Sequence, residues 1–213
     1  MRTTHLGHAA VLLEVAGRRV LFDPGSFSDG WHGLTDLDAI LVTHAHPDHL
    51  DPVHAPALFA ANPDAGVHVE PGVLGLAAVP ERARGLAADG WVELGGVRVS
   101  AVGGLHAVIH RDVPRIGNVG LVVEAPGEPR FFHPGDSLEA IPRGIDVVAV
   151  PMMGPWAALK EHVEFLRALG APRGFGIHDG LLSARGWDLV AARLSELTPT
   201  RVLDLRAGDG WAS

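Results

Sequence analysis

The segment Thr43–His49 reads THAHPDH and directly follows the apolar run Ala39–Val42. The apolar run predicts a buried strand. The segment therefore brings three histidines and one aspartate to the end of a rigid element. Imidazole and carboxylate side chains suit zinc, iron and manganese. A solvated histidine-rich loop has no need of this spacing, so the segment indicates a metal site.

The spacing inside the segment predicts that it serves two ions. Alternate side chains of an extended chain point the same way, so His44 and His46 can bind one ion together. Pro47 then turns the chain, and Asp48 and His49 can face a second ion. One short stretch thus predicts half of a binuclear centre.

The segment matches the H-x-H-x-D-H signature of the metallo-β-lactamase superfamily. The opening His5–Glu14, followed by Val20–Pro24, resembles one branch of that superfamily. The branch contains hydrolases similar to ascorbate-6-phosphate lactonase and to the phospholipase D that acts on N-acyl-phosphatidylethanolamine. The resemblance extends from about residue 3 to about residue 182. It implies an α+β fold, a four-layer αββα sandwich with the site at one edge where two sheets meet. The order of strands and helices alone indicates only α/β or α+β.

The remaining ligands are implied by the resemblance. The superfamily has a third histidine after a strand, which His106 matches, with His110 as its competitor. The stretch His133–Ser137 resembles the family element whose aspartate bridges two metals, and its Gly135 permits a tight turn. The predicted set is His44, His46 and His106 on one ion, Asp48, His49 and His178 on the other, and Asp136 between them.

This set predicts a metal-dependent hydrolase. Two ions can share a hydroxide, because coordination lowers the pKa of water to about 7. Asp48 and Asp136 are the predicted catalytic residues, and Asp48 would orient the hydroxide and carry its proton. The expected substrate is a small-molecule ester, lactone or phosphate ester. The alternative is a non-catalytic metal-binding or regulatory protein on the same scaffold. Zinc is the expected metal, with manganese or iron as alternatives.

Composition limits the other classes of function. The chain has 213 residues, 47% of them hydrophobic, a formal charge of −8 and no cysteine. The length suits a single domain over residues 1–213. The negative charge argues against nucleic acid as a partner, and the absence of cysteine excludes thiolate ligands. Without a predicted signal peptide or membrane span, we expect a cytoplasmic protein. The sequence leaves the substrate, the metal and homo-oligomer formation open.

Several residues carry weaker predictions. Asp23 is expected beneath the segment Thr43–His49, here called the metal loop, as a hydrogen-bond acceptor. The resemblance implies this role. Trp31 can either line a pocket or anchor its loop. His8, His133, His162 and Trp156 receive no definite role, although packing is favoured for His162. Apolar patterns predict helices over residues 52–61, 73–79, 157–169 and 187–197.

Overall fold

The computed structural model describes residues 1–208 and 210–212, and the strands in these ranges form two seven-stranded β-sheets. The first sheet consists, in spatial order, of β14 (Trp211–Ala212), β1 (Arg2–His5), β2 (Val11–Val15), β3 (Arg18–Phe22), β4 (Ala39–Val42), β5 (Gly66–Val69) and β6 (Arg84–Gly85). The second consists of β13 (Arg201–Leu203), β12 (Arg173–Ile177), β11 (Val147–Pro151), β10 (Phe131–His133), β9 (Gly117–Glu124), β8 (Arg98–Leu105) and β7 (Trp91–Glu93).

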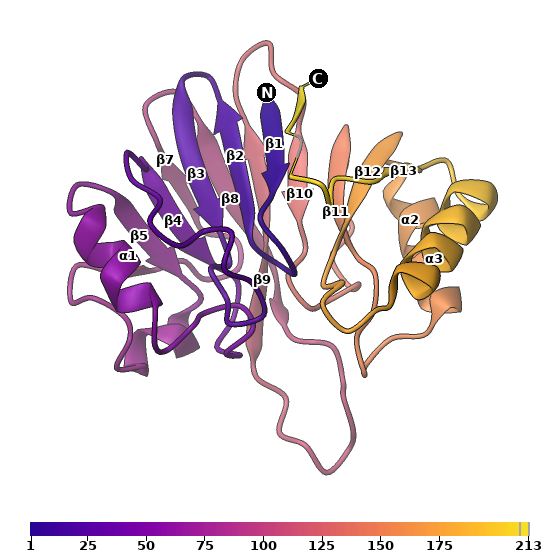
Figure 1. Ribbon diagram of the computed structural model, residues 1–213, viewed down its shortest axis with the longest axis horizontal. Helices are drawn as coiled ribbons and strands as arrows, with labels where there is room; N and C mark the ends of the chain where they lie inside the picture. The colour runs from indigo at the N-terminus through magenta and orange to yellow at the C-terminus, as the bar shows by residue number, and fades with distance from the viewer. Residues whose placement is uncertain (209, 213) are drawn as a thin grey trace.

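The two sheets face each other, and helices cover both outer faces (Figure 1). Helix α1 (Ala55–Ala61) packs on the first sheet, and helices α2 (Leu159–Leu169) and α3 (Ala184–Leu197) pack on the second. This is the metallo-β-lactamase fold, as expected. Its physical basis is alternation along the strands, since neighbouring side chains point to opposite faces. Phe131 lies in the core between the sheets, and its neighbour Phe132 lies in the core beneath the helices.

Each sheet combines an antiparallel meander with parallel strands. In the first sheet, β3, β4 and β5 are parallel, and in the second, β10 to β13 are parallel. Parallel strands carry their carboxyl ends to the same edge of a sheet. The connections that leave β4 in the first sheet, and β10 and β12 in the second, contain Asp48, Asp136 and His178. These side chains therefore lie at the edges of the two sheets where the parallel strands end.

The metal loop is tied to the second sheet by main-chain contacts. The N–H of Val119 in β9 donates to the carbonyl of Thr43, 3.0 Å away. Gly135 has a φ of 61°, and a Cβ there would lie 2.3 Å from Asn118 Oδ1. Only glycine fits this position, which confirms the tight turn predicted before Asp136.

The structure corrects one expectation about the helices. The helix expected over residues 73–79 is a single 3-10 turn, η1 (Pro71–Gly75). Gly72 and Gly75 disfavour a longer helix, and only Val73 in the turn is buried, so no apolar stripe exists to stabilise one. Near the C-terminus, β14 pairs antiparallel with β1.

None of the helices in the described ranges has the length and apolar character needed to cross a membrane.

Phe131 offers a direct test of the core between the sheets. Its ring is fully buried, 5.6 Å from the ring of Phe22 and 6.2 Å from that of Phe175. Phe131→Ala should lower the free energy of unfolding by about 3–5 kcal/mol, because it leaves a cavity. Urea denaturation measures the loss, with Leu189→Ala on the exposed face of α3 as the control, expected within about 0.5 kcal/mol of the parent. A loss below about 1 kcal/mol for Phe131→Ala would contradict this packing.

Candidate metal centre

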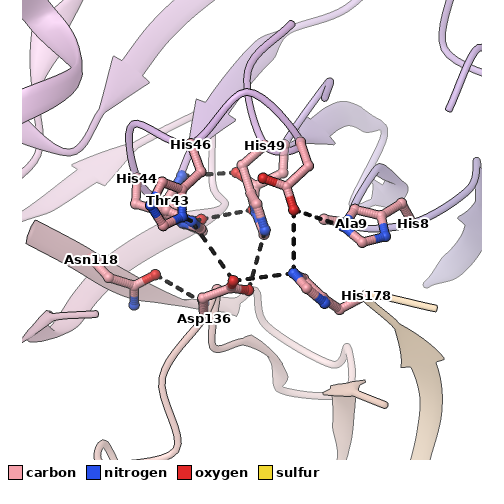
Figure 2. A network of polar contacts seen from close by, with 12 residues as sticks. His8, Ala9, Thr43, His44, His46, His49, Asn118, Asp136 and His178 are labelled. Atoms are coloured by element: carbon pink, nitrogen blue, oxygen red, sulfur yellow. Dashed lines mark hydrogen bonds and ion pairs between the residues drawn. The ribbon is translucent and has the colours of Figure 1, made fainter. Parts of the chain in front are cut away.

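The structure brings all seven predicted ligands together, in two adjacent groups. Figure 2 shows His44, His46, His49, Asp136 and His178 among them. One group is His44, His46, His106 and Asp136, and the other is His8, Asp48, His49 and His178. Within each group, one possible ligand atom per residue lies within 4.8 Å of the others. The residues come from both sheets, and most are buried. Their role as ligands stays a prediction.

Asp136 lies between the two groups (Figure 2). Its Oδ1 lies 3.2 Å from His49 Nε2. Its Oδ2 lies 3.1 Å from His178 Nε2 and 3.4 Å from His106 Nε2. The carboxylate thus faces histidines of both groups, which is the position that a bridging ligand requires.

Asp23 holds the metal loop from below. Its fully buried carboxylate accepts hydrogen bonds from the N–H and the hydroxyl of Thr43, at 2.8 and 2.7 Å, and from His49 Nδ1 at 2.7 Å. The expected acceptor role of Asp23 is confirmed. A carboxylate behind a histidine fixes the ring orientation and leaves its other nitrogen free.

Three more histidines are oriented in the same way. Because the Thr43 hydroxyl donates to Asp23, its oxygen can accept from His44 Nδ1, 3.0 Å away. His106 Nδ1 donates to the Ala107 carbonyl at 2.6 Å, and His178 Nδ1 donates to the Met153 carbonyl. In each neutral ring, the Nε2 lone pair therefore faces the centre.

Buried polar atoms at the centre lack hydrogen-bond partners. They are His49 Nε2, His106 Nε2 and Asp136 Oδ1. Buried polar atoms are nearly always satisfied, so this concentration needs an explanation. Nitrogen and carboxylate oxygen donors that converge without hydrogen bonds fit divalent cations such as zinc, iron or manganese.

The carboxylates of the centre favour positive charge at two of its histidines, His49 and His178. Burial alone would lower the pKa of His49, but the carboxylates of Asp136 and Asp23 outweigh it and raise that pKa well above its usual value. Burial likewise opposes the charged form of His178, yet contacts with Asp136 and Asp48 raise its pKa to about 9. The carboxylates therefore stabilise cations at the positions where the histidine nitrogens converge.

His8 joins the second group, although no definite role was predicted for it. Its Nδ1 accepts a hydrogen bond from the Gly180 N–H at 3.1 Å, so its proton is on Nε2. That Nε2–H donates to Asp48 Oδ2 at 3.0 Å. This tautomer is opposite to that of the other histidines, which makes His8 a residue that orients Asp48. The paired histidines of His5–His8 were the available sequence signal, but the partners of His8 lie far along the chain.

The other candidate histidines do not point into the two groups. His133 donates from Nε2 to the Ala9 carbonyl and accepts from the Gly135 N–H, so both ring nitrogens are used. His162 donates to the Ala158 carbonyl and is packed in α2, as favoured. His110 is exposed in the connection between β8 and β9 and outside both groups.

Trp31 and a third histidine group lie nearby. Trp31 is buried, and its indole donates to the Gly25 carbonyl at 3.1 Å, so Trp31 anchors its loop. His32, Asp51 and His54 form a third group near the surface. Asp51 already accepts from His54 Nδ1 at 2.7 Å and from the N–H of Val53, so hydrogen bonding accounts for this arrangement.

Comparisons with known proteins bear on the family and the fold of the chain. The model of a family described as beta-lactamase superfamily domain matches residues 2–173. The Mycobacterium tuberculosis protein Rv0786c is 39% identical over 201 residues, and the match covers 94% of each chain. A UPF0173 metal-dependent hydrolase of Aeropyrum pernix is 32% identical over 152 residues. That match covers 64% of this chain and 61% of the relative, so it spans less than two thirds of the hydrolase.

A solved structure has the same fold. The metallo-β-lactamase fold protein YhfI from Bacillus subtilis superposes with a TM-score of 0.75 at 15% sequence identity, and the match covers 99% of this chain and 98% of that one. At this identity the likeness concerns the fold.

The choice of His106 over His110 can be tested by metal content. His106→Ala should remove about one of two bound ions per chain, because it deletes a buried nitrogen that faces the centre. His110→Ala, an exposed matched control, should retain both. Elemental analysis of the purified variants gives the number of metal ions bound per chain. Loss of metal from the His110 variant alone would mean that the wrong histidine was chosen.

The orienting role of His8 predicts an intermediate effect. His8→Ala should weaken binding of one ion by about 10–100-fold, the usual effect of losing a partner behind a ligand. His8→Gln should recover part of the affinity, because its amide can donate to Asp48. Competition with a zinc chelator measures the affinities. Unchanged affinity in both variants would exclude the role, and complete loss of one ion in both would make His8 a ligand itself.

Proposed function

The chain belongs to the beta-lactamase superfamily, and from this premise we propose that it is a binuclear metal-dependent hydrolase of a small-molecule ester, lactone or phosphate ester. The observation that carries the proposal is the pair of buried groups that meet at Asp136, with donor atoms that no hydrogen bond satisfies. Residues 1–213 would act as one domain.

The ligands are assigned as two sets of three that share one carboxylate. Asp136 would offer one oxygen to each ion. Zinc is the first choice, and manganese or iron also suit a shell of nitrogen and oxygen without sulfur. When bound, the ions supply Lewis acidity and lower the pKa of water to about 7. The three-residue sets are His44, His46 and His106, and Asp48, His49 and His178.

Asp48 is the residue best placed to move a proton. Its side chain is 18% exposed, whereas that of Asp136 is 3% exposed, so Asp48 is the more open to solvent. Burial opposes its ionisation, but the neighbouring rings of His178 and His8 lower the pKa of Asp48 below its ordinary value. An ionised carboxylate held in place by two histidines can orient an attacking water and accept its proton.

The substrate class follows from the resemblance of the N-terminal segments. Because His5–Glu14 and Val20–Pro24 resemble the lactonase and phospholipase D branch, we infer that lactones and phosphate diesters should be tested first. Substrate choice is a property of the pocket rather than of the fold.

Activity measurements with one ligand variant test the proposal. Zinc- or manganese-loaded protein should hydrolyse bis-p-nitrophenyl phosphate or a member of a lactone panel. Asp136→Ala should lower kcat/KM by more than about 100-fold, because it removes the shared carboxylate. Asp188→Ala, an exposed aspartate on α3, is the matched control and should leave the activity unchanged. If the metal-loaded parent and Asp136→Ala are equally inactive across the panel, the chain is a non-catalytic metal-binding protein.

A further inference from the structure

An apolar groove opens beside the metal centre. Its volume is about 530 Å³, within the usual range for small-molecule sites. It lies between the start of the long connection that follows β8, the segment after Asp136, and helix α2. The apolar lining includes Val108, Leu138, Ile141, Trp156, Phe165 and Ala168. Val108 and Ile141 are 57% and 40% exposed, which is unusual for large apolar side chains in one groove.

Trp156 is shared by the groove and the metal centre. Its indole N–H donates to Asp136 Oδ2 at 3.1 Å. Its ring lies 6.0 Å from that of His106 and 6.1 Å from that of His178. Gly154 makes this placement possible, because a Cβ there would lie 2.4 Å from the indole. A molecule in the groove would therefore contact the residue that bonds the shared carboxylate.

The opposite wall also begins at the metal centre. Ala107 lines the groove, follows His106 in the chain, and donates its N–H to the Asp136 carbonyl at 2.8 Å. Leu138 lies two residues after Asp136. The groove therefore borders the site through Trp156 on one wall and Ala107 on the other.

The groove lining carries no cationic side chain that would bind an anionic chain. Its lining residues include three glutamates and no lysine or arginine. Glu139 pairs with Arg115, and Glu164 pairs with Arg167 at 3.1 Å. Glu161 accepts the Ala158 N–H at 2.6 Å. The carboxylates are occupied by neighbours, so the surface offered to a ligand is mainly apolar.

We propose that this groove binds an aliphatic chain of the substrate, with the ester or lactone carbonyl at the metal centre. The inference rests on the proposed function and narrows it to substrates with an apolar acyl or alkyl arm. Hydrolysis of such an ester consumes one water: the acyl–oxygen bond breaks, the water oxygen bonds to the acyl carbon, and its protons end on the carboxylic acid and the alcohol. Each methylene buried in the groove should raise kcat/KM about two- to fourfold.

A series of p-nitrophenyl esters tests this proposal. With zinc-loaded protein, kcat/KM should rise from acetate through butyrate and hexanoate to octanoate, chiefly through KM. Ala168→Trp, which fills the groove from α2, should lower the ratio of octanoate to acetate kcat/KM by about tenfold. Lys160→Trp, an exposed position on α2 outside the lining, is the matched control and should not change the ratio. A flat or falling series, or equal ratios in the two variants, would overturn the proposal.

Direct binding separates this proposal from the proposed function. Octan-1-ol should bind the parent with a negative heat-capacity change in titration calorimetry, and Ala168→Trp should lose that binding. If octanol binds in this way but no ester is hydrolysed, the groove inference stands and ester hydrolysis fails. If acetate is hydrolysed, the series is flat and octanol does not bind, hydrolysis stands and the groove inference fails.

Discussion

The buried carboxylate of Asp23 is the contact on which the site depends. It is inaccessible to solvent, and it holds the main chain and hydroxyl of Thr43 together with the ring of His49. Burying a charge is costly unless hydrogen bonds satisfy it, and these bonds surround it. Through Thr43 the same carboxylate also orients His44. One residue at the end of β3 thus determines where two ring nitrogens point, one in each group.

The geometry of the centre also depends on the contact between the sheets. The His8 carbonyl accepts from the His178 N–H at 2.8 Å, and His5 Nε2 donates to the same oxygen at 3.0 Å. His8 and His178 have φ values of 50° and 54°, which are uncommon for residues other than glycine. Strain of this kind persists where surrounding contacts hold it, and it concentrates at functional sites. The site is therefore a product of the packed core and not of one loop.

The sequence predicted the local part of this arrangement well. The strand Ala39–Val42 and the metal loop after it follow from an apolar run and the spacing of histidines. The convergence of His106, Asp136 and His178 came from the family resemblance, since no local pattern reports which strands become neighbours. The role of His8 was missed because its tautomer depends on Gly180, 172 residues away. The role of Trp31 could not be predicted from the sequence, because a tryptophan that anchors a loop and one that lines a pocket have the same local pattern.

In the proposed site, Asp136 joins two metal ions in one centre. Anomalous diffraction from crystals of the zinc-loaded protein, recorded at the zinc absorption edge, tests it most directly. We expect two peaks about 3.5–4 Å apart, one on each side of the Asp136 carboxylate. A single peak in the centre, or two peaks that do not share Asp136, would contradict it.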